Sequence, residues 1–241
     1  MGRLFSFQGQ AFMHVELLIQ TPDPEQVVAA AARLCYSNAS IDELMEKSRT
    51  DRQQFLEKIL SLGHHSVLEH VSFSFGIEGI SRACSHQLVR HRLASYSQQS
   101  QRYVSHKKRF SAVTPDSIVA RPDLNQRYQQ LLEEIHQFYG ELLDAGIPAE
   151  DARFLLPNAA TTKIIVTMNG RELRHFFALR GCRRAQWEIQ ALAKQMLKLV
   201  KPVAPTLFAK AGPGCVAGPC PEGKMTCGEI VAVREEFAEL G

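Results

Sequence analysis

Residues 161–180 read TTKIIVTMNGRELRHFFALR and join a β-branched run directly to a helix-forming run. Thr161–Met168 is rich in Thr, Ile and Val, which fit the pleated backbone of a strand. Gly170–Leu179 carries apolar residues at helical spacing, and Asn169 followed three residues later by Glu172 is typical of a helix N-cap. A strand that passes into a helix without a linker predicts a structure that mixes α and β elements.

The same patterns extend this prediction along the chain. Apolar runs of strand length predict further strands at Phe12–Gln20 and Val71–Ile77. Helical spacing predicts helices at Glu25–Cys35, Asp51–Leu62, Ser81–Arg92, Leu124–Ala145 and Ala185–Val200. Ser95–Gln101 has no apolar period and is predicted to be a loop. We therefore expect an α+β protein with one mixed domain of long helices, residues 1–210, followed by a Gly-, Pro- and Cys-rich tail, residues 211–241.

The composition is that of a folded globular protein. Of 241 residues, 45% are apolar and 22% are charged, so the chain can bury a sizeable core and is not disordered. The N-terminus shows no signal-peptide pattern, and no apolar run approaches the ~18 residues that a membrane span needs. We expect a cytoplasmic protein without a membrane partner, in which the six cysteines are thiols rather than disulfides.

Positive charge is concentrated in two stretches although the net charge is only +3. Between Gly79 and Pro115 there is no Asp or Glu, whereas Arg171–Arg184 holds five arginines. The first stretch contains Arg82, Arg90, Arg92, Arg102, Lys107, Lys108 and Arg109. Charge concentrated in this way focuses the electrostatic field on anionic ligands such as phosphates.

Each stretch also has a simpler structural interpretation. The segment from Gln87 to Tyr103 offers guanidinium, hydroxyl and amide groups to a nucleotide, but it could equally be a solvated helix end and a polar loop. In the second stretch, the whole role of Asn169 could be to cap a helix, and that of Arg180 could be to complement the helix dipole before Gly181. That interpretation gives no reason for so many arginines in so short a segment.

The sequence gives little support to a catalytic metal site or to a known nucleotide-binding or hydrolase motif. His65 and His70 are five residues apart, about 140° out of line on a helix, which disfavours a zinc hydrolase. No metal is therefore predicted at the catalytic site. Cys215, Cys220 and Cys227 lack a paired C-x-x-C, so a zinc site completed by a distant ligand and a redox-exposed tail both stay open. No Rossmann, P-loop or G-x-S-x-G motif occurs.

The triplet Arg90-His91-Arg92, a gap of seven residues, Ser100 and then Arg102-Tyr103 resemble the signature of the flavin-dependent thymidylate synthases. Further blocks resemble this family in the same order along the chain. They are His64–His70, Ala152-Arg153, Leu155–Pro157, Asn169-x-Arg171, Leu179-Arg180 and Ala185–Glu188. The resemblance covers about Phe12 to Phe208 and leaves the cysteine-rich tail outside.

The resemblance implies a reaction and an assembly. The family converts dUMP to dTMP with 5,10-methylenetetrahydrofolate as the carbon donor, FAD as the hydride carrier and NADPH as the reductant. It also implies a small, mostly antiparallel sheet, and a homotetramer with active sites at subunit interfaces and no nucleic-acid partner. The sequence leaves NADPH against NADH and the folate's polyglutamate preference open.

The resemblance also assigns site residues. The dUMP-binding set is Gln87, Arg90, Gln98, Gln99, Ser100, Gln101, Arg102, Arg153 and Arg180. The FAD-binding set is Ser66, Arg90, His91, Arg92, Gln98, Asn169, Gly170, Arg171 and His175. His64 is expected near flavin and folate, and Arg180 is the expected catalytic residue because a fixed guanidinium can stabilise negative charge on the uracil. Ser97 and Gln98 stand where relatives often carry Asn and Glu, which removes one negative charge beside the flavin.

Two other classes of protein remain as alternatives. The acid-free stretch with Tyr96, Tyr103 and Phe110 could stack and bind RNA or a nucleotide. An arginine-rich structural oligomer without a ligand is the other. A flavin absorbance spectrum separates these alternatives from a flavin-dependent thymidylate synthase, because only the synthase would be yellow.

Overall fold

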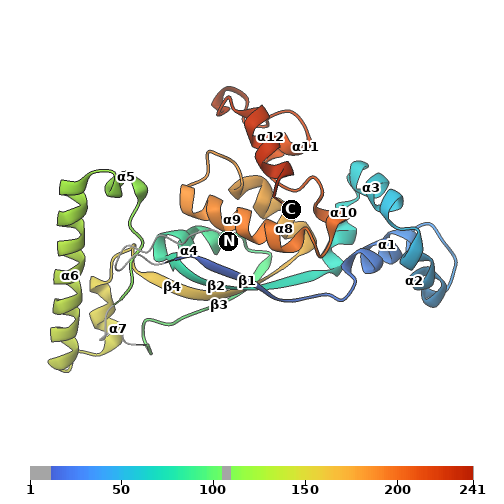
Figure 1. Cartoon of the computed structure of the whole chain (residues 1–241). Helices are drawn as coiled ribbons and strands as arrows, with labels where there is room; N and C mark the ends of the chain where they lie inside the picture. The colour runs from blue at the N-terminus through green and yellow to red at the C-terminus, as the bar shows by residue number, and fades with distance from the viewer. Residues whose placement is uncertain (1–11, 105–109, 241) are drawn as a thin grey trace. The chain divides into compact units, whose positions relative to one another are not determined.

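The computed structural model describes residues 12–104 and 110–240, and within them it contains a four-stranded sheet, whose strands are labelled in Figure 1. The strand order is β1-β2-β4-β3, with the strands at His14–Gln20, Ser72–Ser81, Thr161–Asn169 and Ala94–Gln98. The end of one strand lies beside the start of its neighbour, as the amide of Gly170 shows by donating to the carbonyl of Val71 at 2.9 Å. The predicted small antiparallel sheet is therefore confirmed.

The chain divides into two compact units, and each of the four strands contributes residues to both. Unit 1 holds residues up to His14, Ile77–Val89 and Ser97–Ile164. Unit 2 holds Val15–Gly76, Arg90–Tyr96 and Ile165–Gly241. The division at residue 210 that the sequence suggests stays a prediction.

Unit 1 has α6 as its longest helix. Its helical elements are α4 (Arg82–Leu88), α5 (Asp116–Val119), α6 (Pro122–Asp144), α7 (Ala149–Ala152) and η2 (Arg153–Leu155). Proline at the start of α6 has the backbone angle a helix needs, and Gly146 with φ +84° follows its end. Leu132 and Ile135 of α6 pack on a small core of Phe110, Ala112 and Ala160.

Unit 2 contains the larger core, in which phenylalanines from β2, α8 and α10 meet edge to face. The rings of Phe73 and Phe208 lie 5.4 Å apart, and those of Phe177 and Phe208 lie 6.0 Å apart. Its helical elements are α1 (Pro24–Leu34), α2 (Ile41–Thr50), α3 (Gln53–Ser61), η1 (His65–His70), α8 (Gly170–Arg180), α9 (Trp187–Val200), α10 (Pro205–Phe208), α11 (Gly214–Ala217), η3 (Gly223–Met225) and α12 (Ile230–Ala238).

Two of the sequence predictions are wrong, and both concern the arginine-rich signature. The predicted helix Ser81–Arg92 ends at Leu88, because His91 is drawn into buried contacts that outweigh helix propensity. The predicted loop Ser95–Gln101 contains the edge strand β3. Its inward positions are half-buried Ala94, Tyr96 and Gln98, so the alternation is real but is carried partly by polar residues.

The other predicted helices and strands are confirmed within a few residues at their ends. Helix α2 was not predicted, although Ser40 and Glu43 form a reciprocal capping box at its start. The C-terminal segment contains α12, whose Val233 and Phe237 are buried in unit 2. Within residues 12–104 and 110–240, every helix is too short or too polar to cross a membrane.

Candidate active site

The first turn of α8 lies against η1. The side chain of Asn169 accepts a hydrogen bond from the amide of Glu172 at 2.8 Å, so the predicted N-cap is confirmed. A Cβ atom on Gly170 would lie only 3.0 Å from the carbonyl oxygen of Leu68, so a larger residue would require the two segments to shift apart. This close approach brings the histidines of η1 to the arginines of α8.

A pocket of about 260 Å³ lies where η1 and α8 meet, lined by His65, Leu68, Arg171, Arg174 and His175. Arg171 and His175 belong to the predicted FAD set, whereas His65 and Arg174 do not. Burial, and then the charge of Arg174, lower the pKa of His65 below its ordinary value. The imidazole is therefore neutral near pH 7, and the guanidiniums supply the positive charge of this pocket.

Arg171 is held at the rim of this pocket by a surface ion pair. Its Nη1 atom lies 2.5 Å from Oε1 of Glu69, and both side chains are about half exposed. Pairs of this kind contribute about 0–1 kcal/mol, so an anionic ligand can replace Glu69 at little cost.

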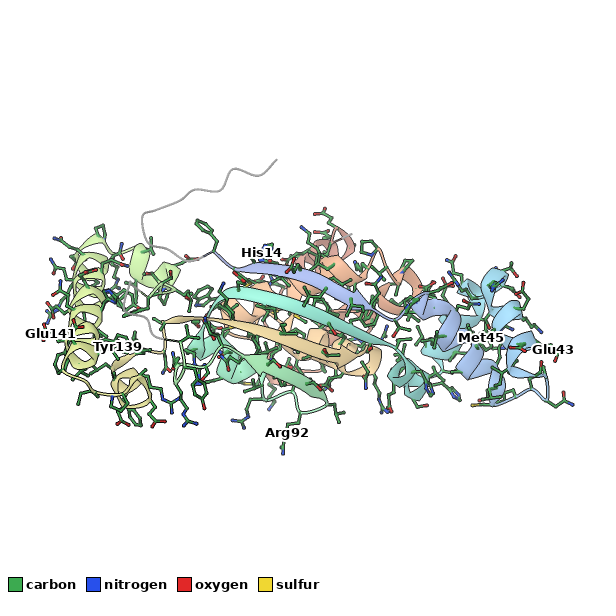
Figure 2. All side chains as sticks on the ribbon, turned by 90° about the horizontal axis from the view of Figure 1, so that it is seen from below. His14, Glu43, Met45, Arg92, Tyr139 and Glu141 are labelled. Atoms are coloured by element: carbon green, nitrogen blue, oxygen red, sulfur yellow. The ribbon has the colours of Figure 1, made fainter. Side chains whose placement is uncertain are left out.

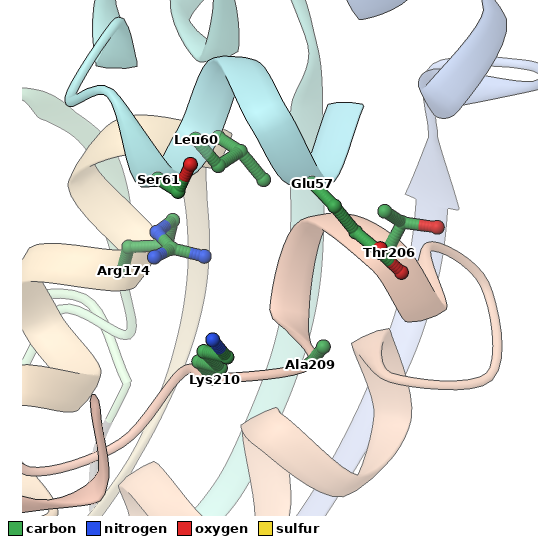
Figure 3. A pocket seen from close by; sticks show the side chains of 7 residues that line it. All are labelled: Glu57, Leu60, Ser61, Arg174, Thr206, Ala209 and Lys210. Atoms are coloured by element: carbon green, nitrogen blue, oxygen red, sulfur yellow. The ribbon is translucent and has the colours of Figure 1, made fainter. Parts of the chain in front are cut away.

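A second pocket, of about 320 Å³, shares Arg174 with the first (Figure 3). Arg174 and Lys210 lie at one end of it, and Glu57 and Thr206 lie at the other. Burial lowers the pKa of Arg174, and its Nη1 atom donates to the carbonyl oxygen of Leu207. One largely buried guanidinium therefore faces two cavities in unit 2.

His91 links Glu172 to Arg180 in a chain of hydrogen bonds that is buried at Glu172 and half-buried at Arg180. Its Nδ1 atom lies 3.1 Å from Oε1 of Glu172, and its Nε2 atom accepts from Nε of Arg180 at 3.0 Å. Because Nε2 accepts, the ring proton belongs on Nδ1 and is donated to Glu172. Burial is the largest cause that lowers the pKa of His91, while its bond to Glu172 raises it. The neutral ring therefore fixes the direction of the Arg180 guanidinium.

Tyr96 completes this cluster from β3. Its hydroxyl donates to the carbonyl oxygen of His91 at 2.8 Å, and burial, followed by the charge of Glu172, raises its pKa. The arginines on either side of His91 behave differently, because Arg90 and Arg92 are exposed. Figure 2 shows Arg92 reaching away from the ribbon. The Arg-His-Arg triplet thus sends its histidine inward and its arginines outward.

In unit 1, Gln98 ties β3 to α4 and β4. Its side-chain amide donates to Oγ of Ser85 at 2.9 Å and to Oγ1 of Thr162 at 3.2 Å. Next along the chain, the amide of Gln99 donates to the carbonyl of Lys163 at 2.9 Å. Gln87 of α4 is half-buried. The start of the predicted dUMP segment is therefore held by sheet and helix.

Glu150 of α7 brings together two predicted dUMP-binding arginines that are distant in sequence. Nη2 of Arg102 lies 2.8 Å from its carboxylate, and Nε of Arg153 donates to its carbonyl oxygen at 3.0 Å. Burial, and then the charge of Arg153, lower the pKa of Arg82, which places a third guanidinium near by. Ser100 accepts from the amide of Arg102 at 3.2 Å, so Ser100–Arg102, including Gln101, form a tight turn.

The predicted residues thus form two groups. His91, Arg180, Asn169, Gly170, Arg171 and His175, with exposed Ser66 and Arg90, lie in unit 2, and Gln87, Gln98–Arg102 and Arg153 lie in unit 1. His64 is exposed, and its ring lies 6.4 Å from that of Tyr36. Sequence reasoning missed Glu172 as the partner of His91, and also His65, Arg174, Arg82 and Glu150. The His-His doublet, the acid-free stretch and the arginine-rich stretch contained signals for His65, Arg82 and Arg174, but nothing marked Glu172 or Glu150 as site residues.

Guanidinium groups clustered at the cavities and turns of an α+β protein are typical of proteins that bind anionic ligands. Comparison with known proteins identifies the family. The family model described as thymidylate synthase complementing protein matches residues 16–206. A flavin-dependent thymidylate synthase of Geobacter sulfurreducens is 62% identical over 230 residues, covering 95% of this chain and 99% of that protein. Another, from Thermococcus onnurineus, is 46% identical over 236 residues, covering 94% and 96%.

A solved structure shares the fold. It is the UMP/dUMP methylase PolB from Streptomyces cacaoi bound with 5-Br dUMP, with a TM-score of 0.71, 23% identity, and coverage of 83% of this chain and 94% of that chain. At this identity the likeness supports the fold alone. The family match and the identities to the two synthases show that the chain belongs to the flavin-dependent thymidylate synthase family.

Proposed function

We propose that this chain methylates dUMP to dTMP, with 5,10-methylenetetrahydrofolate as the carbon donor, FAD as the hydride carrier and NADPH as the reductant. The observation that carries the proposal is the hydrogen-bonded chain Glu172–His91–Arg180, because it holds one guanidinium in a fixed direction. Since these co-substrates are cytoplasmic metabolites, a cytoplasmic location belongs to the same proposal.

Arg180 is the proposed catalytic residue. For C5 of the uracil to attack a one-carbon unit, negative charge must build on N3 and O4 of the ring. A guanidinium that already points at this charge stabilises the transition state without reorganising. Neutral His91 accepts from Nε of Arg180 and leaves the charge on the guanidinium. Glu172 is a positioning residue, because it acts on Arg180 only through His91.

The donor groups of unit 2 fit a flavin dinucleotide. The two pockets share Arg174, and Arg171 and His175 line one of them. A pyrophosphate that extends from one pocket to the other could therefore bind more than one guanidinium. The N-terminal end of α8 adds the positive end of an 11-residue helix dipole. When bound, the flavin would supply the hydride that reduces the transferred carbon to a methyl group.

The turn at Ser100–Arg102, together with Arg153, is proposed to bind the phosphate of dUMP. Arg102 and Arg153 already share one partner, Glu150, and the ion pair between Arg102 and Glu150 is half exposed. A phosphate dianion offers more acceptor atoms and more charge than that carboxylate, so it can take its place.

Titration of the flavin-free purified chain with FAD tests this function. The expected result is saturable binding of about one flavin per chain, seen as a yellow protein whose colour is lost on addition of NADPH. A protein that stays colourless and instead binds oligonucleotides with a steep salt dependence would support the RNA-binding alternative.

Cys84 is the candidate for a covalent nucleophile that this mechanism does not need. Its side chain is fully buried in α4, where its amide donates to Oγ of Ser81 at 3.0 Å. We expect Cys84→Ala to leave kcat for dTMP formation essentially unchanged and to lower the free energy of unfolding by about 1 kcal/mol. A folded Cys84→Ala protein that binds FAD and dUMP but forms no dTMP would reverse the assignment.

We propose that the chain forms a homotetramer in which an exposed apolar face of α6 packs against a second copy. Leu124, Leu131 and Phe138 follow one another at intervals of seven residues and are 45%, 52% and 50% exposed. Side chains at this interval share one side of a helix, and such a stripe is typical of a helix that packs on a second copy.

Replacing Leu131 with Glu is expected to break this contact, because it places charges in an apolar interface. Light scattering after gel filtration should show a tetramer for the parent chain and smaller species for Leu131→Glu. The control is Gln137→Glu, which adds the same charge on another exposed side of this helix and should stay tetrameric. A Leu131→Glu protein of unchanged mass would remove α6 from the interface.

A further inference from the structure

Four of the six cysteines line one small cavity in unit 2. Cys182 follows α8, Cys215 lies in α11, and Cys220 and Cys227 come from the segment between α11 and α12. The cavity volume is about 20 Å³, which leaves room for one ion or one water molecule. The other two cysteines are elsewhere, Cys35 exposed and Cys84 buried in α4. A distant cysteine, Cys182, thus joins the three of the C-terminal segment.

The four thiols are close enough to influence one another. Burial raises the pKa of Cys215 most, and the neighbouring Cys220, Cys182 and Cys227 raise it further. Arg183 lines the same cavity and can offset negative charge on sulfur, whereas Glu222, which also lines it, has the opposite effect. Glu222 is itself 3.6 Å from Arg184.

The segment that carries Cys220 and Cys227 builds almost no core of its own. All residues from 221 to 229 are exposed, so apolar burial does not account for their order. Arginines from neighbouring elements instead hold the backbone: Arg184 donates to the carbonyl oxygen of Met225 at 2.8 Å, and Arg234 donates to that of Gly218 at 2.8 Å. Gly228, with φ +78°, lets the chain turn directly after Cys227.

We propose that Cys182, Cys215, Cys220 and Cys227 bind one structural Zn²⁺ ion. Four sulfur ligands on loops and short helices favour zinc in a closed tetrahedral site, which leaves no coordination position for a substrate. Across residues 12–104 and 110–240, no three His, Cys, Asp or Glu side chains already stand in metal-binding positions, so the ion would draw the exposed segment inward. Metal binding would then be coupled to the ordering of this segment.

The ion would also fix the end of α8. Cys182 is two residues beyond Arg180, the last residue of that helix, and Gly181 between them packs against Phe237 of α12 so closely that a Cβ atom would lie 3.0 Å from its ring. The zinc site is independent of the proposed reaction, because it requires only thiols and a metal.

Metal analysis of the full-length chain tests the site. Protein is produced with zinc in the medium and freed of loosely bound metal. Inductively coupled plasma mass spectrometry should then find about one zinc per chain. In the double variant Cys220→Ser/Cys227→Ser, whose substitutions lie in the exposed segment, zinc should fall below about one tenth of that value. Cys35→Ser is the matched control and should keep its zinc.

Cobalt provides a second readout, which does not depend on activity. Co²⁺ added to the reduced, zinc-free chain should give the intense ultraviolet thiolate-to-metal bands of a tetrahedral sulfur site, and the double variant should not. Parent protein with less than about one tenth of a zinc per chain and no cobalt bands would overturn the proposal. So would zinc retained equally by the double variant, bound iron–sulfur in place of zinc, or disulfides joining these cysteines in the freshly purified chain.

Discussion

Arg180→Ala is expected to lower kcat for dTMP formation by about 100- to 1000-fold while the protein folds and binds FAD as before. Arg180 is half-buried, and its Nε atom is fixed by His91, so its guanidinium is oriented before substrate arrives. Removing one preorganised donor costs the transition state about 2.7–4 kcal/mol, which is the origin of this loss. The measurement is the rate of dTMP formation at saturating substrates, with dUMP affinity determined separately.

Two further variants test whether the loss of activity is due to the position of Arg180 and not to the loss of any one guanidinium. Glu172→Gln keeps the shape of the side chain and the backbone amide that Asn169 caps, but it removes the charge that holds the ring proton of His91. It should lower kcat less than Arg180→Ala and leave the KM for dUMP nearly unchanged. Arg49→Ala, on the exposed face of α2, is the matched loss of a guanidinium and should be neutral. Near-normal turnover by a well-folded Arg180→Ala protein would dismiss the catalytic assignment.

Arg171→Ala is expected to weaken FAD binding by about 10- to 100-fold, since a hydrogen bond to a charged group contributes about 1.5–3 kcal/mol. Arg171 lines the pocket between η1 and α8 but is exposed, so its loss should change the free energy of unfolding little. The dissociation constant for FAD from a fluorescence titration checks this expectation.

The partner of Arg171 supplies the control. Glu69→Gln removes the carboxylate that pairs with Arg171 at 2.5 Å and leaves the guanidinium in place. FAD binding by Glu69→Gln should therefore be equal to or tighter than that of the parent. Equal weakening by Arg171→Ala and Glu69→Gln would mean that the ion pair shapes the local structure and that Arg171 does not contact the flavin.

Local signals in the sequence were sufficient for most of the fold. The strand at Thr161, the helix start at Asn169 and the helix end before Gly146 each depend on residues a few positions apart. Strand β3 was missed because an edge strand needs no apolar residues, and hydroxyls of Ser85 and Thr162 satisfy its inward Gln98 instead. The sheet order β1-β2-β4-β3 also lies beyond any local pattern.

The site was harder to predict for the same physical reason. The sequence pattern accounts for Glu172 as a residue of the helix start. Its carboxylate nevertheless forms a hydrogen bond with a histidine 81 positions away. Arg174 looks like any helix arginine until the fold closes two cavities around it. The three C-terminal cysteines indicate a possible metal site, but only the fold brings Cys182 to them. Contacts between distant segments create these functions, and no residue spacing records them.

A single-turnover experiment tests the central claim most directly. The FAD-loaded chain is reduced without oxygen by NADPH, freed of excess reductant, and mixed with dUMP and 5,10-methylenetetrahydrofolate while flavin absorbance and dTMP are followed together. We predict that flavin colour returns at the rate at which dTMP appears, with about one dTMP for each flavin reoxidised. Formation of dTMP while the flavin stays reduced, or reoxidation without any dTMP, would contradict it.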